Sequence, residues 1–103
     1  MVATHETERI KVESPIHPGR IKWVDADMYA AMKRAFLRVL PTTEPGLTLA
    51  EIEARLLPRL PEKLFPQGAK AGWWSKTVQL DLEAKGVVVR HRARPIRLRK
   101  TSR

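Results

Sequence analysis

The C-terminal end of the chain concentrates side chains that can bind a polyanion. Residues 85–103 hold eight of the 20 lysines and arginines and none of the 11 acids, so most of the net charge of +9 falls there. Guanidinium groups bind phosphate oxygens through paired hydrogen bonds, and an acid-free basic run therefore predicts contact with nucleic acid or another anionic surface. The alternative is a solvated tail that only aids solubility. That interpretation would be favoured if these residues formed coil and not ordered strands. The arginines expected to act are Arg90, Arg92, Arg94, Arg97 and Arg99.

A second set of polar side chains recurs at helical spacing in "WWSKTVQLDLE". The exposed strip of this helix would consist of Ser75, Lys76, Gln79 and Glu83. Lysine binds guanine acceptors or phosphate, glutamine forms paired bonds with adenine, and serine bonds with either, whereas Glu83 would be repelled by phosphate. Lys70, just before this helix, could meet a phosphate at the positive helix end. An ordinary solvated helix face explains the same four helix residues equally well.

Patterns typical of catalysis are missing from the sequence. No two of the three histidines have metal-ligand spacing such as H-x-x-x-H, and the chain has neither cysteine nor a glycine-rich phosphate loop. Asp25 and Asp27 are better explained by helix capping than by acid–base chemistry. We therefore expect no enzymatic activity, no metal and no small-molecule cofactor.

The length and composition indicate one small globular domain. The chain has 103 residues, of which 43% are hydrophobic, and three of them are tryptophans. No apolar run approaches the roughly 18 residues that a membrane helix needs, and "MVATHETERIKVES" lacks the apolar region of a signal peptide. We expect a cytoplasmic protein that does not associate with a membrane.

The N-terminal third predicts a tail, a pair of extended segments and a helix. Residues 1–9 are polar and unpatterned and are expected to fray. Residues 10–24 alternate apolar and polar side chains around the turn sequence "SPIHPG", which predicts a short hairpin or two extended segments. The apolar periodicity of "DADMYAAMKRAFLRVLP" predicts a helix that begins with Asp25 as its N-cap and ends before Pro41.

Two further helices are predicted between residues 47 and 86. Thr48 and Glu51 have capping-box spacing, and the helix that they start should end or kink near Leu57, because a proline follows. The next helix, within "WWSKTVQLDLEAKG", should end at Gly86. Its Asp81 can pair with a lysine four residues on. Its two apolar rows are Trp74, Val78 and Leu82, and Trp73, Leu80 and Ala84, and we expect these tryptophans and Trp23 to be buried.

The basic C-terminal stretch reads as a β-hairpin. A four-residue loop, "RARP", would place Val89 opposite Leu98 and Arg90 opposite Arg97. The apolar face would then cover the core, and the arginine face would point outward. Two arginines directly opposite each other repel, and an anion between them would relieve the repulsion. A slip of one residue would reverse the two faces.

The element order and the segment "TVQLDLEAKGVVVR" resemble the winged helix-turn-helix family over about residues 25–100. The resemblance implies an α+β fold with a three-helix core and a C-terminal hairpin, the wing, here preceded by the N-terminal extended segment and followed by a basic end at residues 101–103. Many such proteins have a strand between their first and second helices. Here that gap is only "PTTEPGL", so we expect "RIKWV" either to supply the third strand or to pair with a neighbouring chain.

The resemblance also implies a function. The third helix would enter the major groove of double-stranded DNA and the wing would lie along the backbone, with weak sequence specificity. The alternative is a protein-interaction module, for dimerisation or as an adaptor, which predicts an exposed apolar patch around Trp23. RNA binding and a homodimer both stay open. The stretches "HPGR", "LFPQGAKAGWW" and "KTVQLDLEAKGV" are also similar to a family of small, functionally uncharacterised bacterial proteins, which supplies no activity.

Overall fold

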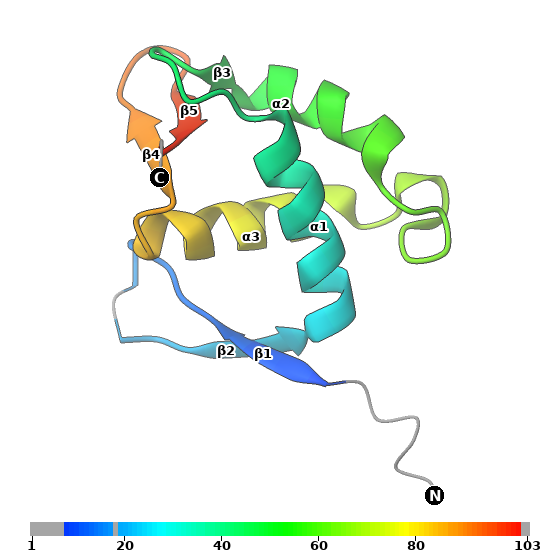
Figure 1. Cartoon of the computed structure of the whole chain (residues 1–103). Coiled ribbons are helices and arrows are strands. Elements are labelled where there is room, and N and C mark those ends of the chain that lie inside the picture. Colours follow the sequence, from blue (N-terminus) through cyan, green and yellow to red (C-terminus); the bar gives the residue numbers. More distant parts are fainter. Residues whose placement is uncertain (1–7, 18, 102–103) are drawn as a thin grey trace, which may run out of the picture.

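The computed structural model describes residues 8–17 and 19–101, and within them the chain is an α+β protein (Figure 1). Three α-helices pack around one core, and two small antiparallel sheets lie at its edges. The expected tail at residues 1–9 falls mostly outside the described residues, but Arg9 already belongs to the first strand. Of the expected basic end, only Thr101 is described. No helix in the described ranges is long and apolar enough to cross a membrane.

Helix α1 (Ala26–Val39) begins and ends where the sequence predicts. The Asp25 side chain accepts a hydrogen bond of 2.9 Å from the Met28 N–H, which satisfies a free donor of the first turn. Leu40 is extended and precedes a proline, and the helix therefore stops at Val39. Its buried side chains are Tyr29, Ala31, Met32, Ala35 and Phe36.

Helix α2 (Leu49–Leu56) begins at the predicted capping box. The Glu51 N–H donates to the Thr48 hydroxyl at 3.2 Å, and the Thr48 N–H donates to the Glu51 carboxylate at 2.9 Å. The helix ends at Leu56, close to the expected end near Leu57, and a 3₁₀ turn, η2 (Leu57–Arg59), follows at the proline. A second 3₁₀ turn, η3 (Pro66–Gly68), lies in the connection to the third helix.

Helix α3 (Ala71–Ala84) packs mainly against α1 (Figure 1). Trp74, Val78 and Leu82 are buried, which confirms one of the two predicted apolar rows. The helix ends at Ala84 with Lys85 as its C-cap, and Gly86 follows with a φ of +75°, a left-handed conformation that glycine adopts without strain.

The prediction that all three tryptophans are buried is wrong for two of them. Trp23 is 57% exposed and Trp73 is 49% exposed, whereas Trp74 is 6% exposed. Trp23 alternates along its strand with the buried Val24 and so lies on the opposite face, beside the Lys11 ammonium at 5.9 Å from its ring centre. Trp73 is covered only in part, by the Lys22 ammonium at 5.2 Å from its ring centre. The Trp73 ring also contacts the buried Trp74 ring edge to face, with ring centres 5.0 Å apart, so it lies at the border of the core.

The N-terminal hairpin is confirmed. Strand β1 (Arg9–Val12) pairs antiparallel with β2 (Lys22–Asp25), and Ile10 lies opposite Val24. Val12 and Val24 are buried in the same core as the helices. The hairpin is therefore part of the folded domain.

The second sheet corrects the expected strand assignment. Strand β3 (Leu47–Thr48) lies between α1 and α2 and pairs with β5 (Arg97–Lys100), which pairs in turn with β4 (Val88–His91). The third strand thus comes from the α1–α2 connection and not from "RIKWV", which pairs with β1. A two-residue strand carries no alternation from which sequence could have predicted it.

The register of the C-terminal hairpin differs by one residue from the prediction. Arg90 lies opposite Leu98, and His91 lies opposite Arg97. The loop between the strands has five residues, 92–96, and not four, which accounts for the shift. Val88, which lies opposite Lys100, and Leu98 are consequently the buried side chains of the two strands, at 3% and 0% exposure.

Candidate functional site

A groove runs between α2, α3 and the β4–β5 hairpin, with a volume of about 360 Å³. We call it the α3 groove. Phe36, Ile52 and Leu80 contribute apolar surface to it. Four of the residues predicted to bind nucleic acid line it together, and Ile96 of the hairpin loop closes one side. These four residues are Ser75, Lys76, Gln79 and Arg90.

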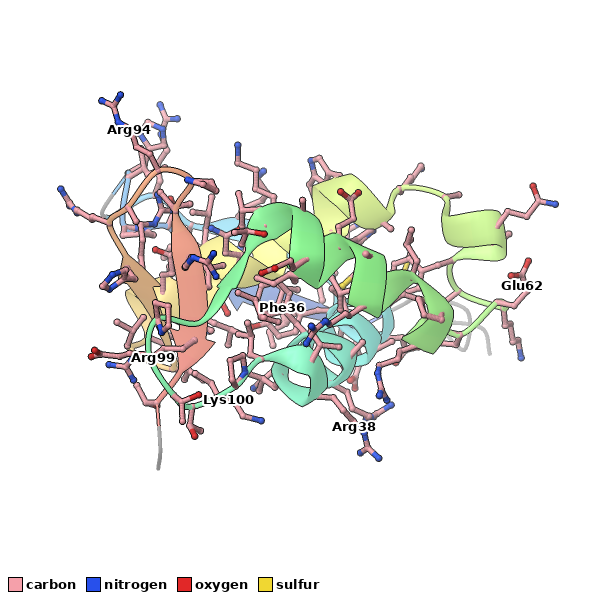
Figure 2. The ribbon with its side chains drawn as sticks, turned by 90° about the horizontal axis from the view of Figure 1, so that it is seen from above. Phe36, Arg38, Glu62, Arg94, Arg99 and Lys100 are labelled. Carbon is pink, nitrogen blue, oxygen red and sulfur yellow. The ribbon has the colours of Figure 1, made fainter. Side chains whose placement is uncertain are left out.

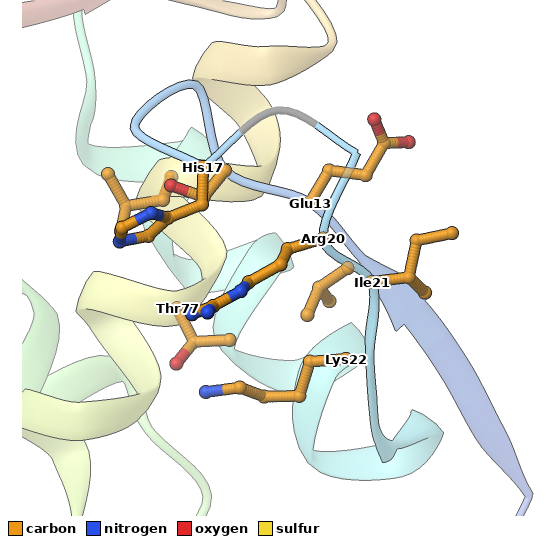
Figure 3. A pocket seen from close by; sticks show the side chains of 9 residues that line it. Glu13, His17, Arg20, Ile21, Lys22 and Thr77 are labelled. Carbon is orange, nitrogen blue, oxygen red and sulfur yellow. The ribbon is translucent and has the colours of Figure 1, made fainter.

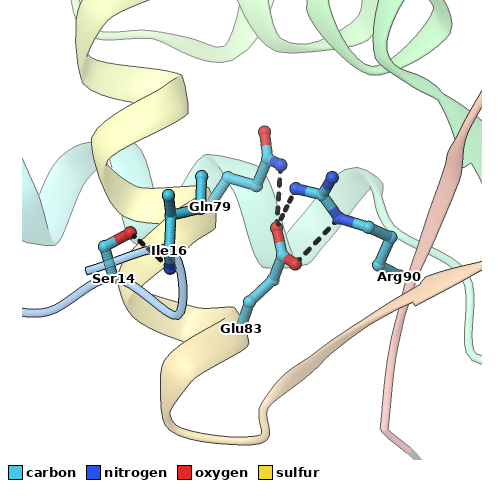
Figure 4. Close-up of polar contacts among 5 residues, drawn as sticks. All are labelled: Ser14, Ile16, Gln79, Glu83 and Arg90. Carbon is cyan, nitrogen blue, oxygen red and sulfur yellow. Dashed lines mark hydrogen bonds and ion pairs between the residues drawn. The ribbon is translucent and has the colours of Figure 1, made fainter. Parts of the chain in front are cut away.

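Glu83 links α3 to the hairpin at one end of this groove (Figure 4). The Arg90 guanidinium donates to both carboxylate oxygens of Glu83, each at 3.0 Å. The Gln79 amide donates to the same carboxylate at 2.8 Å. The hydrogen bond from Arg90 to Glu83 is the main cause that raises the pKa of Arg90. A paired, bidentate geometry of this kind holds both side chains in place.

This cluster corrects the predicted exposed strip. Gln79 is only 6% exposed, and the Glu83 side chain is 9% exposed. Both residues are engaged with each other, and Arg90 lies on the helix side of the hairpin because of the shifted register. Gln79 therefore has no free amide edge for a base, and Glu83 neutralises a cation that we expected to face outward. Ser75 donates its hydroxyl to the Gly72 carbonyl at 3.1 Å, and Lys76 stays exposed.

Arg97 and Arg99 lie on the other face of the hairpin and do not join the groove. The Arg97 guanidinium donates to the Gly46 carbonyl at 3.1 Å and lies 3.8 Å from the Glu51 carboxylate. The Arg99 guanidinium lies 3.8 Å from the carboxylate of Glu44. The charge asymmetry of the sequence is thus partly offset in space, because the α1–α2 connection brings Glu44, and the first turn of α2 brings Glu51, to the basic hairpin.

The loop of the C-terminal hairpin keeps two exposed cations. Arg92 and Arg94 line a hollow of about 510 Å³ next to the α3 groove, and Figure 2 shows Arg94 directed away from the rest of the chain. Neither residue forms an ion pair with the described part of the chain. Lys70 does not join this group. It has a left-handed backbone with φ of 62° and lines a separate hollow with Trp73 and Trp74.

A buried carboxylate on the opposite side of α3 was only partly foreseen. The predicted pair is confirmed, since the Lys85 ammonium lies 2.8 Å from the Asp81 carboxylate. Asp81 is also 0% exposed and accepts hydrogen bonds from the Tyr29 hydroxyl and, at 2.9 Å, from the Glu13 N–H. Burial, and then the hydrogen bond to Asp81, raise the pKa of Tyr29 above its ordinary range. The sequence signal that could have indicated this burial is the position of Asp81 between Leu80 and Leu82 in an apolar helix.

The described residues contain no group of three histidine, aspartate or glutamate side chains placed to hold a metal ion. The polar side chains that line the α3 groove are two cations, Lys76 and Arg90, the Gln79 amide, the Ser75 hydroxyl and one carboxylate, Glu53.

The fold and the groove define a small α+β protein in which helices and a β-hairpin border a groove of mixed apolar and polar lining. The chain belongs to the Family of unknown function (DUF6958), whose model matches residues 9–98. No curated protein and no solved structure matches it.

Proposed function

We propose that this chain binds double-stranded DNA as a winged helix-turn-helix protein, with α3 in the major groove and the β4–β5 hairpin as the wing. The observation that carries the proposal is the β3–β5–β4 sheet. It supplies the strand between the first two helices that the winged-helix resemblance calls for. It also fixes the hairpin so that its loop borders the α3 groove.

The proposed contacts are fewer than the sequence suggested. Lys76 is exposed on α3, and Arg92 and Arg94 are exposed on the loop, so these three cations are the main phosphate contacts. Ser75 adds a hydroxyl at the groove. Arg90 can contribute only by exchanging Glu83 for a phosphate.

Binding should be weakly specific for sequence. The side chain best suited to reading adenine, Gln79, is buried against Glu83. Phosphate contacts orient a protein on the duplex but carry no sequence information. Arg97 and Arg99 stabilise the sheet in this proposal, and Lys70 lies outside the contact surface.

The test is binding to a short fluorescent duplex, measured by anisotropy over a range of salt concentrations. With three cations on phosphates, log affinity should fall with log salt at a slope of about −3. The double variant Arg92→Gln with Arg94→Gln should make the slope of log affinity against log salt less negative by about two. The matched control is Arg34→Gln with Arg38→Gln, two exposed cations of α1 outside the groove, which should leave it unchanged. Absence of duplex binding at low salt, or equal effects of the two double variants, would refute the proposal.

A protein-interaction module is the second candidate, and one observation favours it. Trp23 and Ile21 of the N-terminal hairpin are 57% and 54% exposed, as an apolar contact surface requires. If a second copy of the chain covers this surface, sedimentation velocity should show a dimer, and Trp23→Ser should dissociate it. A monomer at all concentrations would exclude self-association through Trp23.

A further inference from the structure

A second pocket adjoins the α3 groove at Leu80, between α3 and the N-terminal hairpin, and has a volume of about 330 Å³. The turn and strand of the hairpin contribute His17, Arg20 and Lys22 to its lining, and α3 contributes Thr77. Figure 3 shows the ends of Arg20 and Lys22 directed toward Thr77, with His17 beside them. Three bases from one hairpin thus converge on a helix hydroxyl.

Arg20 and Lys22 differ from three of the arginines of the C-terminal hairpin in having no acidic partner among the described residues. Arg90, Arg97 and Arg99 each lie near a carboxylate, whereas no ion pair within residues 8–17 and 19–101 includes Arg20 or Lys22. Like charges gathered around a concave surface repel one another unless an anion joins them. The pocket therefore has the electrostatic character of an anion site.

The remaining polar groups are consistent with this character. The one acid of the lining is Glu13, and Figure 3 shows its carboxylate directed away from the three bases. The Ser14 hydroxyl accepts from the Ile16 N–H at 3.1 Å, which leaves its own proton free to donate. Lys22 is held toward α3 by the Trp73 ring. Guanidinium, ammonium and hydroxyl donors around one space match the several acceptor oxygens of a phosphate group.

The hairpin that carries these bases is anchored to α3. The Glu13 N–H donates to the buried Asp81 carboxylate at 2.9 Å, and Val12 is buried in the core. The end of β1 that lines the pocket is therefore fixed relative to α3, and Lys22 is restrained by its contact with the Trp73 ring. A restrained donor binds more tightly than a mobile one because less freedom is lost on binding.

We propose that this pocket, formed by His17, Arg20, Lys22 and Thr77, binds a phosphate group. The phosphate can belong to the backbone of a bound duplex or to a small phosphorylated molecule, because both present the same oxygens. The site does not depend on the proposed function, since it lies outside the α3 groove and shares with it only Leu80.

The experiment titrates the full chain with inorganic phosphate and follows backbone amides by two-dimensional NMR, with chloride at equal ionic strength as the reference. Saturable shifts are expected at His17, Arg20, Lys22 and Thr77. Arg20→Gln with Lys22→Gln should weaken phosphate binding at least about tenfold, since hydrogen bonds to charged groups are among the stronger ones. The charge-matched control, Arg34→Gln with Arg38→Gln, should stay within about twofold of the natural chain.

A second variant tests whether phosphate binding is lost only because positive charge has been removed. Thr77→Val keeps every charge and should weaken phosphate binding by about threefold or more, because one hydroxyl donor is removed. The NMR spectrum of each variant reports whether it is folded. The proposal is overturned if phosphate shifts do not saturate at these amides, or if the Arg20 and Lys22 double variant binds phosphate as well as the control does.

Duplex binding then identifies the source of the phosphate. If the Arg20 and Lys22 double variant also loses duplex affinity, the pocket holds a backbone phosphate. If duplex affinity is unchanged while phosphate binding is lost, the ligand is a small phosphorylated molecule. If the natural chain binds no duplex, the proposed function fails, and the phosphate titration still decides the status of this pocket.

Discussion

The hydroxyl of Tyr29 on α1 donates a hydrogen bond to the buried carboxylate of Asp81 on α3. The same carboxylate accepts from the Glu13 N–H and from the Lys85 ammonium. One side chain therefore joins the N-terminal hairpin, the first helix and the third helix. A buried carboxylate of this kind is tolerated because hydrogen-bond donors surround it. Removal of the carboxylate or of one of its donors leaves a buried group without a partner.

Substitution at this cluster should destabilise the fold by unequal amounts. Asp81→Asn removes the charge that three donors face and should lower the free energy of unfolding by about 2–4 kcal/mol. Tyr29→Phe removes one donor and should cost about 1–2 kcal/mol. Urea unfolding followed by tryptophan fluorescence measures both. Asp27→Asn, an exposed position of the first turn of α1, is the control and should change stability by less than about 1 kcal/mol. If Asp81→Asn were as stable as this control, Asp81 would not be the side chain that joins the hairpin, α1 and α3.

The raised pKa of Tyr29 predicts a loss of stability at alkaline pH. Its ordinary pKa is 10.0, and burial together with Asp81 raises it in the folded chain. Above about pH 10 the unfolded tyrosine loses its proton while the folded one keeps it, so unfolding becomes more favourable as pH rises. Below that pH the contribution is fully present. Unfolding free energies measured between about pH 9 and about pH 11 should fall less steeply for Tyr29→Phe. The other titratable groups are the same in both proteins. If unfolding free energy fell equally steeply with pH in the natural chain and in Tyr29→Phe, an effect of Tyr29 would be excluded.

Gly46 should be intolerant of any side chain. Its φ is +89°, and a Cβ there would collide with the Leu98 carbonyl of the adjacent strand. Gly46→Ala should therefore cost roughly 3 kcal/mol or more and weaken the β3–β5 pairing. Gly86→Ala is the matched control, because Gly86 has a φ of +75° but open space around it and should cost only about 1 kcal/mol. Thermal unfolding measures the stability of both variants. Gly46→Ala reports steric collision and backbone strain together, and Gly86→Ala reports backbone strain alone.

Glu83 should oppose duplex binding if the proposed function is right. Glu83→Gln removes a negative charge from the α3 groove and releases Arg90 for a phosphate. Duplex affinity should rise about threefold or more, and the salt slope should steepen by about one. Glu62→Gln, at the end of the molecule far from Arg94 in Figure 2, should have no such effect. An affinity that falls or stays constant in Glu83→Gln would show that Arg90 has only a structural role.

Local signals in the sequence were sufficient to predict the helices. The N-cap at Asp25, the capping box at Thr48 and the left-handed end at Gly86 each depend on a few neighbouring residues, and each is confirmed. The buried row from Trp74 to Leu82 follows from helical periodicity in the same way.

The features that sequence missed depend on distant pairing. One extra loop residue moved Arg90 to the helix side of its hairpin, where it met Glu83. The acids near Arg97 and Arg99 come from the first turn of α2 and from the α1–α2 connection, far earlier in the chain, and β3 brings them to the hairpin. Three of the five arginines expected on the charged surface therefore lie near a carboxylate. Linear charge counts cannot detect this, because they carry no information on which strands meet.

Strand β5 lies in the middle of its sheet, with β3 on one side and β4 on the other. The Lys100 N–H donates to the Pro41 carbonyl at 2.9 Å, and its ammonium donates to the Leu37 carbonyl at 2.7 Å. The arginine-bearing hairpin is therefore no independent arm, since its return strand pairs with β3 and its last residue, Lys100, is bonded to the end of α1 and to Pro41. Lengthening the α1–α2 connection should consequently change the position of Arg92 and Arg94 relative to α3 without altering either residue.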